Sequence, residues 1–565
     1  MKVVIVGGVA GGATAAARLR RLDEKAEIIV LERSGFVSYA NCGLPYYVGG
    51  VISRRGALTL QTPESFRTRF NIDVRVKNEV VEILRESKQV RVRRLEDGTE
   101  YLENYDKLIL SPGAKAVIPP VAGVDSDKIF TLRTVEDTFK IDDFIKEKLP
   151  SQAVVIGGGF IGIEAAENLR NRGIAVTLVE WADQVMPQMD YDMACILNAH
   201  LRAQGVTLRL GTRLTAFSEK EGKLIAHTDK GDIEADMTLM SVGVVPDTAL
   251  AKQAGLTLGL KGAIVTDEHM RTSDESIYAV GDAVQIKNSV SGKDALIALA
   301  GPANKQGRIA ADNICGIGSR YKGAAGSSVL KVFEMTAAFT GLSEKAAKDL
   351  GLEADKVVLF SPNHATYYPG AKNMTLKVIF EKKSGKILGA QAVGYEGVEK
   401  RIDVLSAAIR AKMTAYDLQE LDLCYAPPFS SAKDPVNMAG YVIANVLEGC
   451  KQFHWTDLPA ASADENAVLL DVRTNEEFAA GHFKGALHIP VDELRERLNE
   501  LDKKKKIYVN CQSGLRSYIA CRILSGNGFE CYNFSGGYRF YAIVAGEAKA
   551  EGIACHPCGI PVREE

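Results

Sequence analysis

The sequence predicts an α/β protein with two Rossmann-like nucleotide-binding domains, an α+β domain and a C-terminal α/β domain. The first observation is a glycine-rich strand–turn–helix–strand segment that occurs twice, about 150 residues apart. The second is a change near residue 327 to a meander with hairpins, followed by helical periodicity in 400–411 and 416–421. The third is a compact α/β segment at 459–548. The 565 residues have room for about four such domains.

The first glycine-rich segment, "KVVIVGGVAGGATAAARLRRLDEKAEIIVLERS", is typical of a parallel βαβ unit. We predict strands at 3–6 and 28–31 and the crossover helix at 13–22. Glycines in such a turn let backbone N–H groups approach a pyrophosphate at the helix N-terminus. Val9 departs from the fingerprint, since it takes the place of the middle glycine. The residues expected to bind a dinucleotide here are Gly7, Gly8, Gly11, Gly12 and, at the end of the second strand, Glu32.

The second segment, "QAVVIGGGFIGIEAAENLRNRGIAVTLVEWAD", repeats the pattern with strands at 154–156 and 176–179. Its fingerprint is complete: Gly157, Gly159 and Gly162 lie in the turn around Phe160, and Glu180 ends the next strand. Two fingerprints with correctly placed acids argue against purely structural turns. Glu180 would repel a 2′-phosphate, and Trp181 beside it adds no cation, so we expect NADH to be preferred over NADPH.

Composition excludes several other classes of protein. Hydrophobic residues make up 46% and charged residues 25% of the chain, and the net charge is -2, which gives no basis for binding nucleic acid or an anionic membrane. No apolar stretch approaches the ~20 residues that span a bilayer. Glycines interrupt the apolar N-terminus, which lacks the layout of a secretory signal. Ten irregularly spaced cysteines are typical of free thiols, so we expect a cytoplasmic location.

Three further stretches resemble the flavoproteins with two dinucleotide-binding domains, the pyridine nucleotide-disulfide oxidoreductases. They are "LILSPGA" (108–114), "SVGVVPDT" (241–248) and "TSDESIYAVGDA" (272–283). The resemblance implies that the first domain binds FAD and the second NADH, with NADPH possible. In the family, the aspartate matching Asp282 contacts the ribitol and pyrophosphate region of FAD. The further cofactor-binding residues that the resemblance implies are Arg33, Ser111, Pro112, Gly113, Arg133, Gly243 and Gly281.

A single cysteine, Cys42, lies in "SYANCGLPYY" (38–47), where flavin-dependent disulfide reductases usually have two. This stretch resembles coenzyme A-disulfide reductases, whose relatives include NADH oxidases, NADH peroxidases and persulfide reductases, and the match extends to 364–370, 394–409 and 425–437. With one cysteine, the enzyme cannot store electrons as an internal disulfide. Its oxidised form is instead a mixed disulfide with a small thiol, a sulfenic acid or a persulfide.

The resemblance assigns roles to residues around Cys42. Tyr367 and Tyr425 match tyrosines that the partner subunit contributes, which implies a homodimer with composite active sites. Arg18 and Arg21 share one helix face, for which a solvated basic surface is the alternative interpretation. Phe70 stands where some relatives have a lysine directed toward coenzyme A, with Arg69 beside it. The residues that match the coenzyme A site of the family are Thr14, Arg18, Arg21, Ser38, Asn41, Asn304 and Lys433.

The C-terminal segment resembles a single rhodanese domain in 469–494, 508–524 and 533–541. Its loop has four residues between cysteine and arginine, whereas related phosphatase loops have five, and the shorter loop favours sulfane sulfur transfer. Backbone N–H groups of such a loop can stabilise a thiolate or persulfide. Cys521 and Cys531 are expected in the core, and Cys555 and Cys558 in a frayed tail or a redox pair. The loop consists of Cys511, Gln512, Ser513, Gly514, Leu515 and Arg516.

These resemblances imply six segments. The FAD-binding domain comprises 1–112 and 245–326, the NAD(P)H-binding domain 113–244, the dimerisation domain 327–448, a linker 449–458, the rhodanese domain 459–548 and a tail 549–565. The sequence thus predicts an FAD-dependent, NAD(P)H-driven reductase of persulfides, polysulfides and coenzyme A disulfide, coupled to sulfur transfer. The alternatives are an NADH oxidase or peroxidase that cycles through a Cys42 sulfenic acid, and a redox or sulfur sensor.

Overall fold

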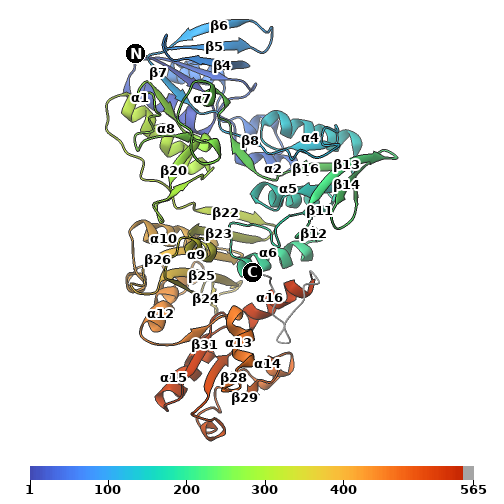
Figure 1. Ribbon diagram of the computed structural model, residues 1–565, viewed down its shortest axis with the longest axis vertical. Coiled ribbons are helices and arrows are strands. Elements are labelled where there is room, and N and C mark those ends of the chain that lie inside the picture. Colours follow the sequence, from blue (N-terminus) through green and yellow to red (C-terminus); the bar gives the residue numbers. More distant parts are fainter. Residues whose placement is uncertain (551–565) are drawn as a thin grey trace. The chain divides into compact units, whose positions relative to one another are not determined.

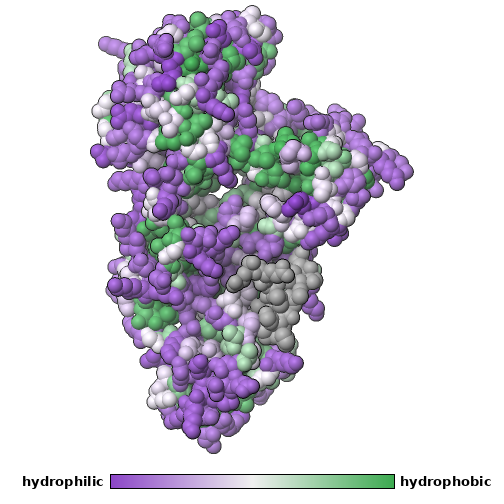
Figure 2. All heavy atoms as spheres, viewed as in Figure 1, coloured by the Kyte–Doolittle hydropathy of each residue, from purple (hydrophilic) through white to green (hydrophobic). Residues whose placement is uncertain are grey.

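The computed structural model describes residues 1–550 and confirms the predicted α/β fold (Figure 1). The described chain divides into two compact units: Met1–Trp181 with Gly205–Gly326, and Ala182–Gln204 with the chain from Ser327 onward. Within residues 1–550, no helix has the length and apolar character needed to cross a membrane. Hydrophilic residues cover most of the face shown in Figure 2, and hydrophobic residues form separate patches on it.

A parallel five-stranded sheet, in the order β19-β7-β1-β2-β3, organises the first nucleotide-binding half. Val3, Val4 and Ile5 are fully buried, as a strand covered on both faces requires. The predicted strands and helix of the first segment are confirmed. The elements are β1 (Lys2–Val6), β2 (Glu27–Glu32), β3 (Asp73–Val76), β7 (Lys107–Leu110), β19 (Ile277–Ala279), and the helices α1 (Ala10–Leu22) and α8 (Ala300–Ile314), which pack together (Figure 1).

Smaller elements complete this half. The chain leaves through β8 (Ala114–Ala116) and returns through β17 (Val244–Pro246), and these two strands pair antiparallel. An antiparallel meander, β4 (Asn78–Leu84), β5 (Gln89–Arg94) and β6 (Glu100–Asn104), lies at one end. The remaining elements are α2 (Leu44–Val48), α3 (Pro63–Phe70), α7 (Ala249–Gln253), β18 (Ile264–Val265), β20 (Val284–Lys287) and β21 (Asp294–Ala295).

The second nucleotide-binding half repeats the architecture with the strand order β12-β11-β10-β16-β9. The strands predicted at 154–156 and 176–179 are confirmed. An antiparallel sheet of β13 (Leu214–Lys220), β14 (Lys223–Thr228) and β15 (Ile233–Ala235) adjoins it. The main elements are β9 (Ile129–Thr131), α4 (Val135–Lys148), β10 (Gln152–Ile156), α5 (Phe160–Asn171), β11 (Ala175–Val179), β12 (Thr207–Arg209) and β16 (Met237–Met240).

The second unit begins with a five-stranded antiparallel sheet in the order β22-β23-β26-β25-β24. The predicted meander and both predicted helices are confirmed. Helix α6 (Tyr191–Ala203) belongs to this unit, although it lies between β11 and β12 in the sequence. The other elements are β22 (Ser328–Val332), β23 (Met335–Gly341), α9 (Glu344–Asp349), β24 (Ala354–Pro362), β25 (Asn373–Glu381), β26 (Ile387–Gly394), α10 (Val398–Arg410), α11 (Ala415–Gln419) and α12 (Pro435–Leu447).

The C-terminal part of this unit is a parallel sheet in the order β27-β31-β30-β28-β29. The segment 449–458, predicted as a linker, contributes β27 to this sheet because its Phe453 and Trp455 are buried. Cys555 and Cys558 lie outside the described residues. The elements are β27 (Gln452–Phe453), α13 (Leu458–Ala463), β28 (Ala467–Asp471), α14 (Asn475–Ala479), β29 (Leu487–His488), β30 (Lys506–Asn510), α15 (Leu515–Gly526), β31 (Cys531–Phe534) and α16 (Gly537–Ala550).

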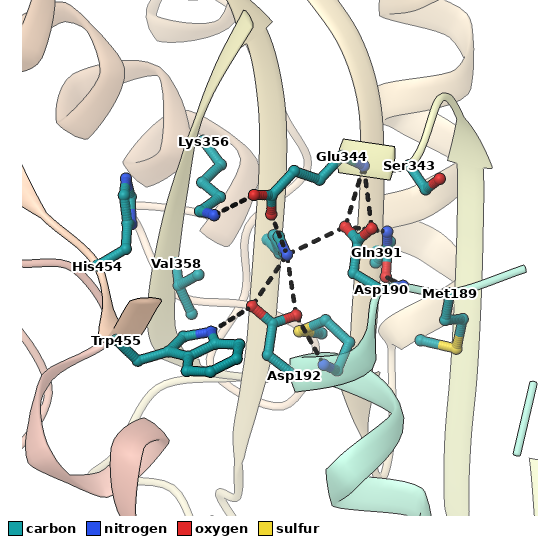
Figure 3. Close-up of polar contacts among 12 residues, drawn as sticks. Met189, Asp190, Asp192, Ser343, Glu344, Lys356, Val358, Gln391, His454 and Trp455 are labelled. Atoms are coloured by element: carbon teal, nitrogen blue, oxygen red, sulfur yellow. Dashed lines mark hydrogen bonds and ion pairs between the residues drawn. The ribbon is translucent and has the colours of Figure 1, made fainter. Parts of the chain in front are cut away.

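A buried cation holds several elements of the second unit together. The ammonium group of Lys377, on β25, is fully buried and lies 2.8 Å from Asp192 and 3.0 Å from both Asp190 and Glu344. Figure 3 shows these carboxylates converging from α6 and α9. The indole N–H of Trp455 donates to Asp192 at 3.1 Å. The start of α6, the antiparallel sheet and the C-terminal part therefore share one charge cluster.

Electrostatics in this cluster favour the charged forms. Burial alone would lower the pKa of Lys377, but attraction to Asp192, Asp190 and Glu344 outweighs burial and raises it. Burial alone would likewise raise the pKa of Glu344, but Lys377 and Lys356 lower it to about 2. Each charge thus depends on its partners, and removal of one partner leaves buried charges uncompensated.

We predict that Lys377→Met destabilises the protein by about 3 kcal/mol, because Asp190 and Asp192 then lose their buried counter-charge. Urea-induced unfolding would measure the change. Lys383→Met is the control, because Lys383 is exposed on the loop after β25. A loss below about 1 kcal/mol for Lys377→Met would contradict the role of this cluster.

Candidate active sites

The first glycine turn is too tightly packed to admit side chains at two positions. Gly7 has φ +93°, and a Cβ atom there would lie 2.1 Å from the carbonyl oxygen of Ser111. A Cβ on Gly12 would lie 1.9 Å from the carbonyl oxygen of Gly7. The N–H of Gly8 donates to the Glu32 carboxylate at 2.8 Å, which fixes this acid at the end of β2. The turn thus brings the N-terminus of α1 close to the predicted ribose-binding carboxylate.

The second turn has the same construction. Gly157 has φ +105°, and a Cβ on Gly162 would lie 1.8 Å from the Gly157 carbonyl oxygen. The N–H of Gly158 donates to Glu180 at 2.6 Å. A Cβ on Gly159, by contrast, would meet no atom of the described chain within 4 Å. Packing of the described chain therefore does not require glycine at this place, which leaves room for a ligand, and the fold can accept Val9 at the matching place in the first turn.

The other predicted FAD-binding residues gather at the same edge of the first sheet. Because the strands are parallel, the segments that follow β7 and β19 lie beside the first turn. The Ser111 hydroxyl accepts a hydrogen bond from the N–H of Gly12 at 3.1 Å. Arg133 pairs with Asp282 at 2.7 Å. Gly113 and Gly281 have positive φ, and Pro112 lies between Ser111 and Gly113. Arg33 pairs with Asp247 at 2.9 Å. These residues fit a dinucleotide that lies along this edge.

The nicotinamide half places Gly243, with φ +116°, after β16 at the corresponding edge of its sheet. Phe160 begins α5 directly after Gly159. Trp181 is exposed, and the guanidinium group of Arg213 lies 5.4 Å from the centre of its ring. Arg213, in the loop between β12 and β13, therefore places near Trp181 a cation that the local sequence did not indicate.

Cys42 lies in the 3₁₀ turn Asn41–Gly43, and its side chain is exposed. The pKa of the Cys42 thiol is raised, first by desolvation and then by the negative charges of Glu164 and Asp282, whereas Arg133 opposes the rise. The thiol therefore lies among the predicted FAD-binding residues of the first unit. A free thiol beside acidic groups needs a further positive or polarising influence to react as a thiolate at neutral pH.

Glu164, on α5, is a site residue that the sequence analysis missed. The Tyr46 hydroxyl donates to this carboxylate at 3.3 Å. Burial raises the pKa of Glu164 to about 7, despite the hydrogen bond from Tyr46. An acid in the second turn of a helix that follows a dinucleotide fingerprint was the available signal. Glu164 thus changes its charge near neutral pH beside Cys42.

The predicted coenzyme A residues of the first unit lie on α1, α8 and the Cys42 loop. The Thr14 hydroxyl lies 2.5 Å from the Asn304 side-chain oxygen. Arg18 pairs with the buried Asp312 at 2.7 Å, whereas Arg21 is exposed and makes no ion pair within residues 1–550. Arg21 is therefore the cation of this pair that is free to bind an anion. Ser38 and Asn41 are half-buried next to Cys42, and Phe70 packs against Phe66.

Tyr367 and Tyr425 come together in the second unit. Both are exposed, and their hydroxyl groups lie 2.8 Å apart. The buried Arg401 positions both loops, since it donates to the Asn363 carbonyl at 2.9 Å and to Asp434 at 3.0 Å. Lys433, the remaining predicted coenzyme A residue, is exposed on the second of these loops. That the pair serves the site of a partner subunit stays a prediction.

The C-terminal loop surrounds the sulfur of Cys511, which is fully buried. The N–H of Gly514, which has φ +99°, donates to Sγ at 3.1 Å. The Ser517 hydroxyl donates to Sγ at 3.3 Å, and the sequence analysis missed this residue because it lies beyond the loop motif. Arg516 pairs with Glu477 at 2.7 Å. Leu515 is exposed, while Gln512 and Ser513 are half-buried. The loop thus presents hydrogen-bond donors to one sulfur.

Comparison with known families assigns three matches. Residues 1–307 match the pyridine nucleotide-disulphide oxidoreductase family, 327–435 its dimerisation domain and 455–542 the rhodanese-like domain. The chain is 35% identical to a NADH oxidase of Methanocaldococcus jannaschii, over 78% of this chain and 98% of that protein. It is 37% identical to a coenzyme A disulfide reductase of Staphylococcus aureus, over 78% of this chain and 99% of that protein.

Two solved structures are similar along nearly the whole chain. Reduced Bacillus anthracis CoADR-RHD has 48% identity and a TM-score of 0.95, and the match covers 97% of this chain and 98% of that one. A NAD-dependent persulfide reductase from A. fulgidus has 41% identity and a TM-score of 0.89, and the match covers 96% and 100%.

We predict that Glu164→Gln lowers the pKa of the Cys42 thiol, because the neutral amide removes a nearby negative charge above pH 7. The measurement is the pH dependence of Cys42 alkylation by iodoacetamide, quantified on the tryptic peptide 34–54. Glu147→Gln, at an exposed position of α4, is the control. A midpoint that stays unchanged or moves to higher pH in Glu164→Gln would refute the interaction.

Proposed function

The chain belongs to the pyridine nucleotide-disulphide oxidoreductase family, and we propose that it reduces persulfides, polysulfides and coenzyme A disulfide at Cys42 with FAD and NAD(P)H. The single observation that carries this proposal is the free, exposed thiol of Cys42 among the FAD-binding residues. No second cysteine occurs in 38–47, so the substrate would supply the sulfur that pairs with Cys42. The similarity to a coenzyme A disulfide reductase and to a persulfide reductase supports this substrate class.

Bound FAD would accept hydride from the nicotinamide and supply two electrons to sulfur. Around it, the two glycine turns would hold the pyrophosphates of FAD and NAD(P)H, while Glu32 and Glu180 would bind ribose hydroxyls. Cys42 would attack the disulfide of the substrate, release one thiol and keep the other as a mixed disulfide. With a persulfide, Cys42 would attack the outer sulfur, the S–S bond would break, the substrate thiolate would leave with the electron pair, and Cys42 would carry the persulfide.

The remaining site residues would position the substrate. Arg21, together with Thr14 and Asn304, would bind the phosphates and pantetheine of coenzyme A along α1. Tyr367 and Tyr425 would come from the partner subunit of a homodimer, and their hydroxyl groups would protonate the departing thiolate. The match to the dimerisation domain supports this assembly. We place the enzyme in the cytoplasm, in keeping with its free thiols.

The rhodanese-like domain would carry sulfane sulfur on Cys511. The Gly514 N–H and the Ser517 hydroxyl, which already donate to Sγ, would stabilise a thiolate or persulfide there. The family matches also support the proposed division of the chain into FAD-binding (1–112, 245–326), NAD(P)H-binding (113–244), dimerisation (327–448) and rhodanese (459–548) domains.

An NADH oxidase is the second candidate, favoured by the similarity to the archaeal protein of that name. In this case Cys42 would cycle through a sulfenic acid. The residues proposed to bind coenzyme A along α1, such as Arg21 and Thr14, would then have no part in the reaction. The rhodanese-like domain would have none either. NADH consumption under oxygen without any sulfur substrate separates the two candidates.

We predict that Cys42→Ser abolishes NADH-driven reduction of coenzyme A persulfide but spares sulfur transfer from thiosulfate by the rhodanese-like domain. Cys511→Ser should abolish sulfur transfer from thiosulfate but spare NADH-driven reduction of coenzyme A persulfide. The reason is that Cys42 is exposed and Cys511 lies on a separate loop. NADH oxidation and thiocyanate formation from cyanide measure the two activities. If Cys511→Ser also eliminated reduction of coenzyme A persulfide, the two sulfur centres would act obligatorily in series.

We also predict that NADH is preferred, with a kcat/KM at least about tenfold above that with NADPH, because Glu180 repels a 2′-phosphate. Glu180→Ala should narrow this ratio, since Arg213 near Trp181 can then attract the phosphate. Glu221→Ala, at an exposed turn, controls for the loss of a surface charge. Equal or better efficiency of the wild-type enzyme with NADPH would overturn this assignment.

A further inference from the structure

Three thiols line a single cavity in the C-terminal part of the second unit. The cavity has a volume of about 500 Å³, and Cys450, Cys521 and Cys531 contribute to its wall. Cys521 lies on α15, Cys531 begins β31 and Cys450 precedes β27. All three are free. None of the three thiols belongs to the loop around Cys511, so the cavity is a separate cluster of cysteine side chains.

Two of these thiols lie close together. The Cys531 thiol donates a hydrogen bond to the backbone carbonyl oxygen of Cys521 at 3.3 Å. The two side chains also influence each other's pKa. This proximity follows from the packing of α15 against β31. No group of three His, Cys, Asp or Glu within residues 1–550 is arranged to hold a metal ion. The pair therefore has the proximity of a dithiol rather than the arrangement of a metal site.

The environments of the two thiols differ in a way that separates a nucleophile from a resolving thiol. The interaction between the two side chains lowers the pKa of Cys531 and, with burial, raises the pKa of Cys521. Cys531 is also the more exposed of the two thiols, at 8% against 3%, and the cations Lys451 and Arg522 act on it. We therefore assign the nucleophilic role to Cys531 and the resolving role to Cys521.

The charged side chains that line the cavity leave one cation without an ion pair. Lys451, Arg522 and Glu530 all line it. Lys451 is paired with Glu530 at 2.6 Å, whereas Arg522 is exposed and makes no ion pair within the described chain. A free guanidinium group beside a nucleophilic thiol favours a small anionic ligand over a neutral one. Inorganic polysulfides are anions whose sulfane sulfur reacts with thiolates.

We propose that Cys531 and Cys521 form a second sulfur-reactive site, which reduces the sulfane sulfur of inorganic polysulfide and becomes a disulfide. Cys531 attacks a terminal sulfur of the polysulfide, the S–S bond breaks, and the shortened polysulfide leaves with the electron pair. Cys531 then carries a persulfide. Cys521 attacks the Cys531 sulfur and expels hydrosulfide, which takes up the thiol proton. Two thiols are thereby oxidised to a disulfide, and one sulfane sulfur is reduced to sulfide.

The test uses the full-length, FAD-loaded protein with Cys42→Ser and Cys511→Ser, so that neither proposed centre of the main activity contributes. The protein is treated anaerobically with inorganic tetrasulfide and no NADH, then digested with trypsin. Cleavage after Arg522 separates Cys521 from Cys531, so a disulfide links the peptides 517–522 and 523–539. We expect this linked pair, with release of one hydrosulfide per chain from the resolving step.

Variants assign the two roles. Cys521→Ser should leave an added sulfur atom trapped on Cys531, and Cys531→Ser should leave Cys521 unmodified. Cys315→Ser, at a half-buried thiol of the first unit, should behave as the parent. The cross-link in the parent protein needs no new variant at these thiols, so misfolding cannot obscure the outcome. Both peptides recovered as free thiols from the parent would overturn the proposal, as would a persulfide on Cys521 instead of Cys531.

Discussion

Two strand-to-helix turns are the constraint on which both nucleotide-binding halves depend. In each turn the first and last glycines approach so closely that a Cβ on the last would lie less than 2 Å from a carbonyl oxygen. The N–H group after the first glycine binds the acid that ends the next strand, Glu32 in one half and Glu180 in the other. A backbone this compact points its free N–H groups outward from the helix N-terminus, which suits a pyrophosphate. Because the strands of each sheet are parallel, the predicted contacts that follow β7 and β19 lie beside the first turn, and Gly243, which follows β16, lies beside the second.

The chain offers sulfur three different environments, and the physical differences among them suggest a division of labour. Cys42 is exposed, with a pKa raised by desolvation and by Glu164 and Asp282, so its reactivity depends on what binds beside it. Cys511 is buried within a loop whose Gly514 and Ser517 donate to its sulfur, which suits a carrier of sulfane sulfur. Cys531 lies close to a second thiol and donates to the Cys521 carbonyl oxygen, an arrangement that suits disulfide formation. We therefore propose electron delivery at Cys42, sulfur storage at Cys511 and thiol–disulfide exchange at Cys531.

The sequence was sufficient to predict features that depend on local pattern. The βαβ segments, the meander, both helices and the α/β C-terminal part appear as predicted, because glycine turns and hydrophobic periodicity act over a few residues. Contacts between distant segments could not be predicted. Arg213 reaches Trp181 from the loop between β12 and β13. Lys377 pairs with Asp190 just before α6, Asp192 in α6 and Glu344 in α9. Ser517 lies just outside the loop motif. Glu164 has a raised pKa because it is buried, and a local stretch of sequence does not show which residues the fold buries.

The proposed reaction depends on a substrate that supplies the sulfur that pairs with Cys42. Peptide mapping can detect this pairing in the FAD-loaded enzyme, treated anaerobically with coenzyme A disulfide before and after addition of NADH. Cys42 is the only cysteine in the tryptic peptide 34–54. We expect this peptide to carry one coenzyme A in a mixed disulfide and to lose it when NADH is added. A peptide 34–54 linked instead by a disulfide to another cysteine of the protein would show that the chain itself supplies the second sulfur.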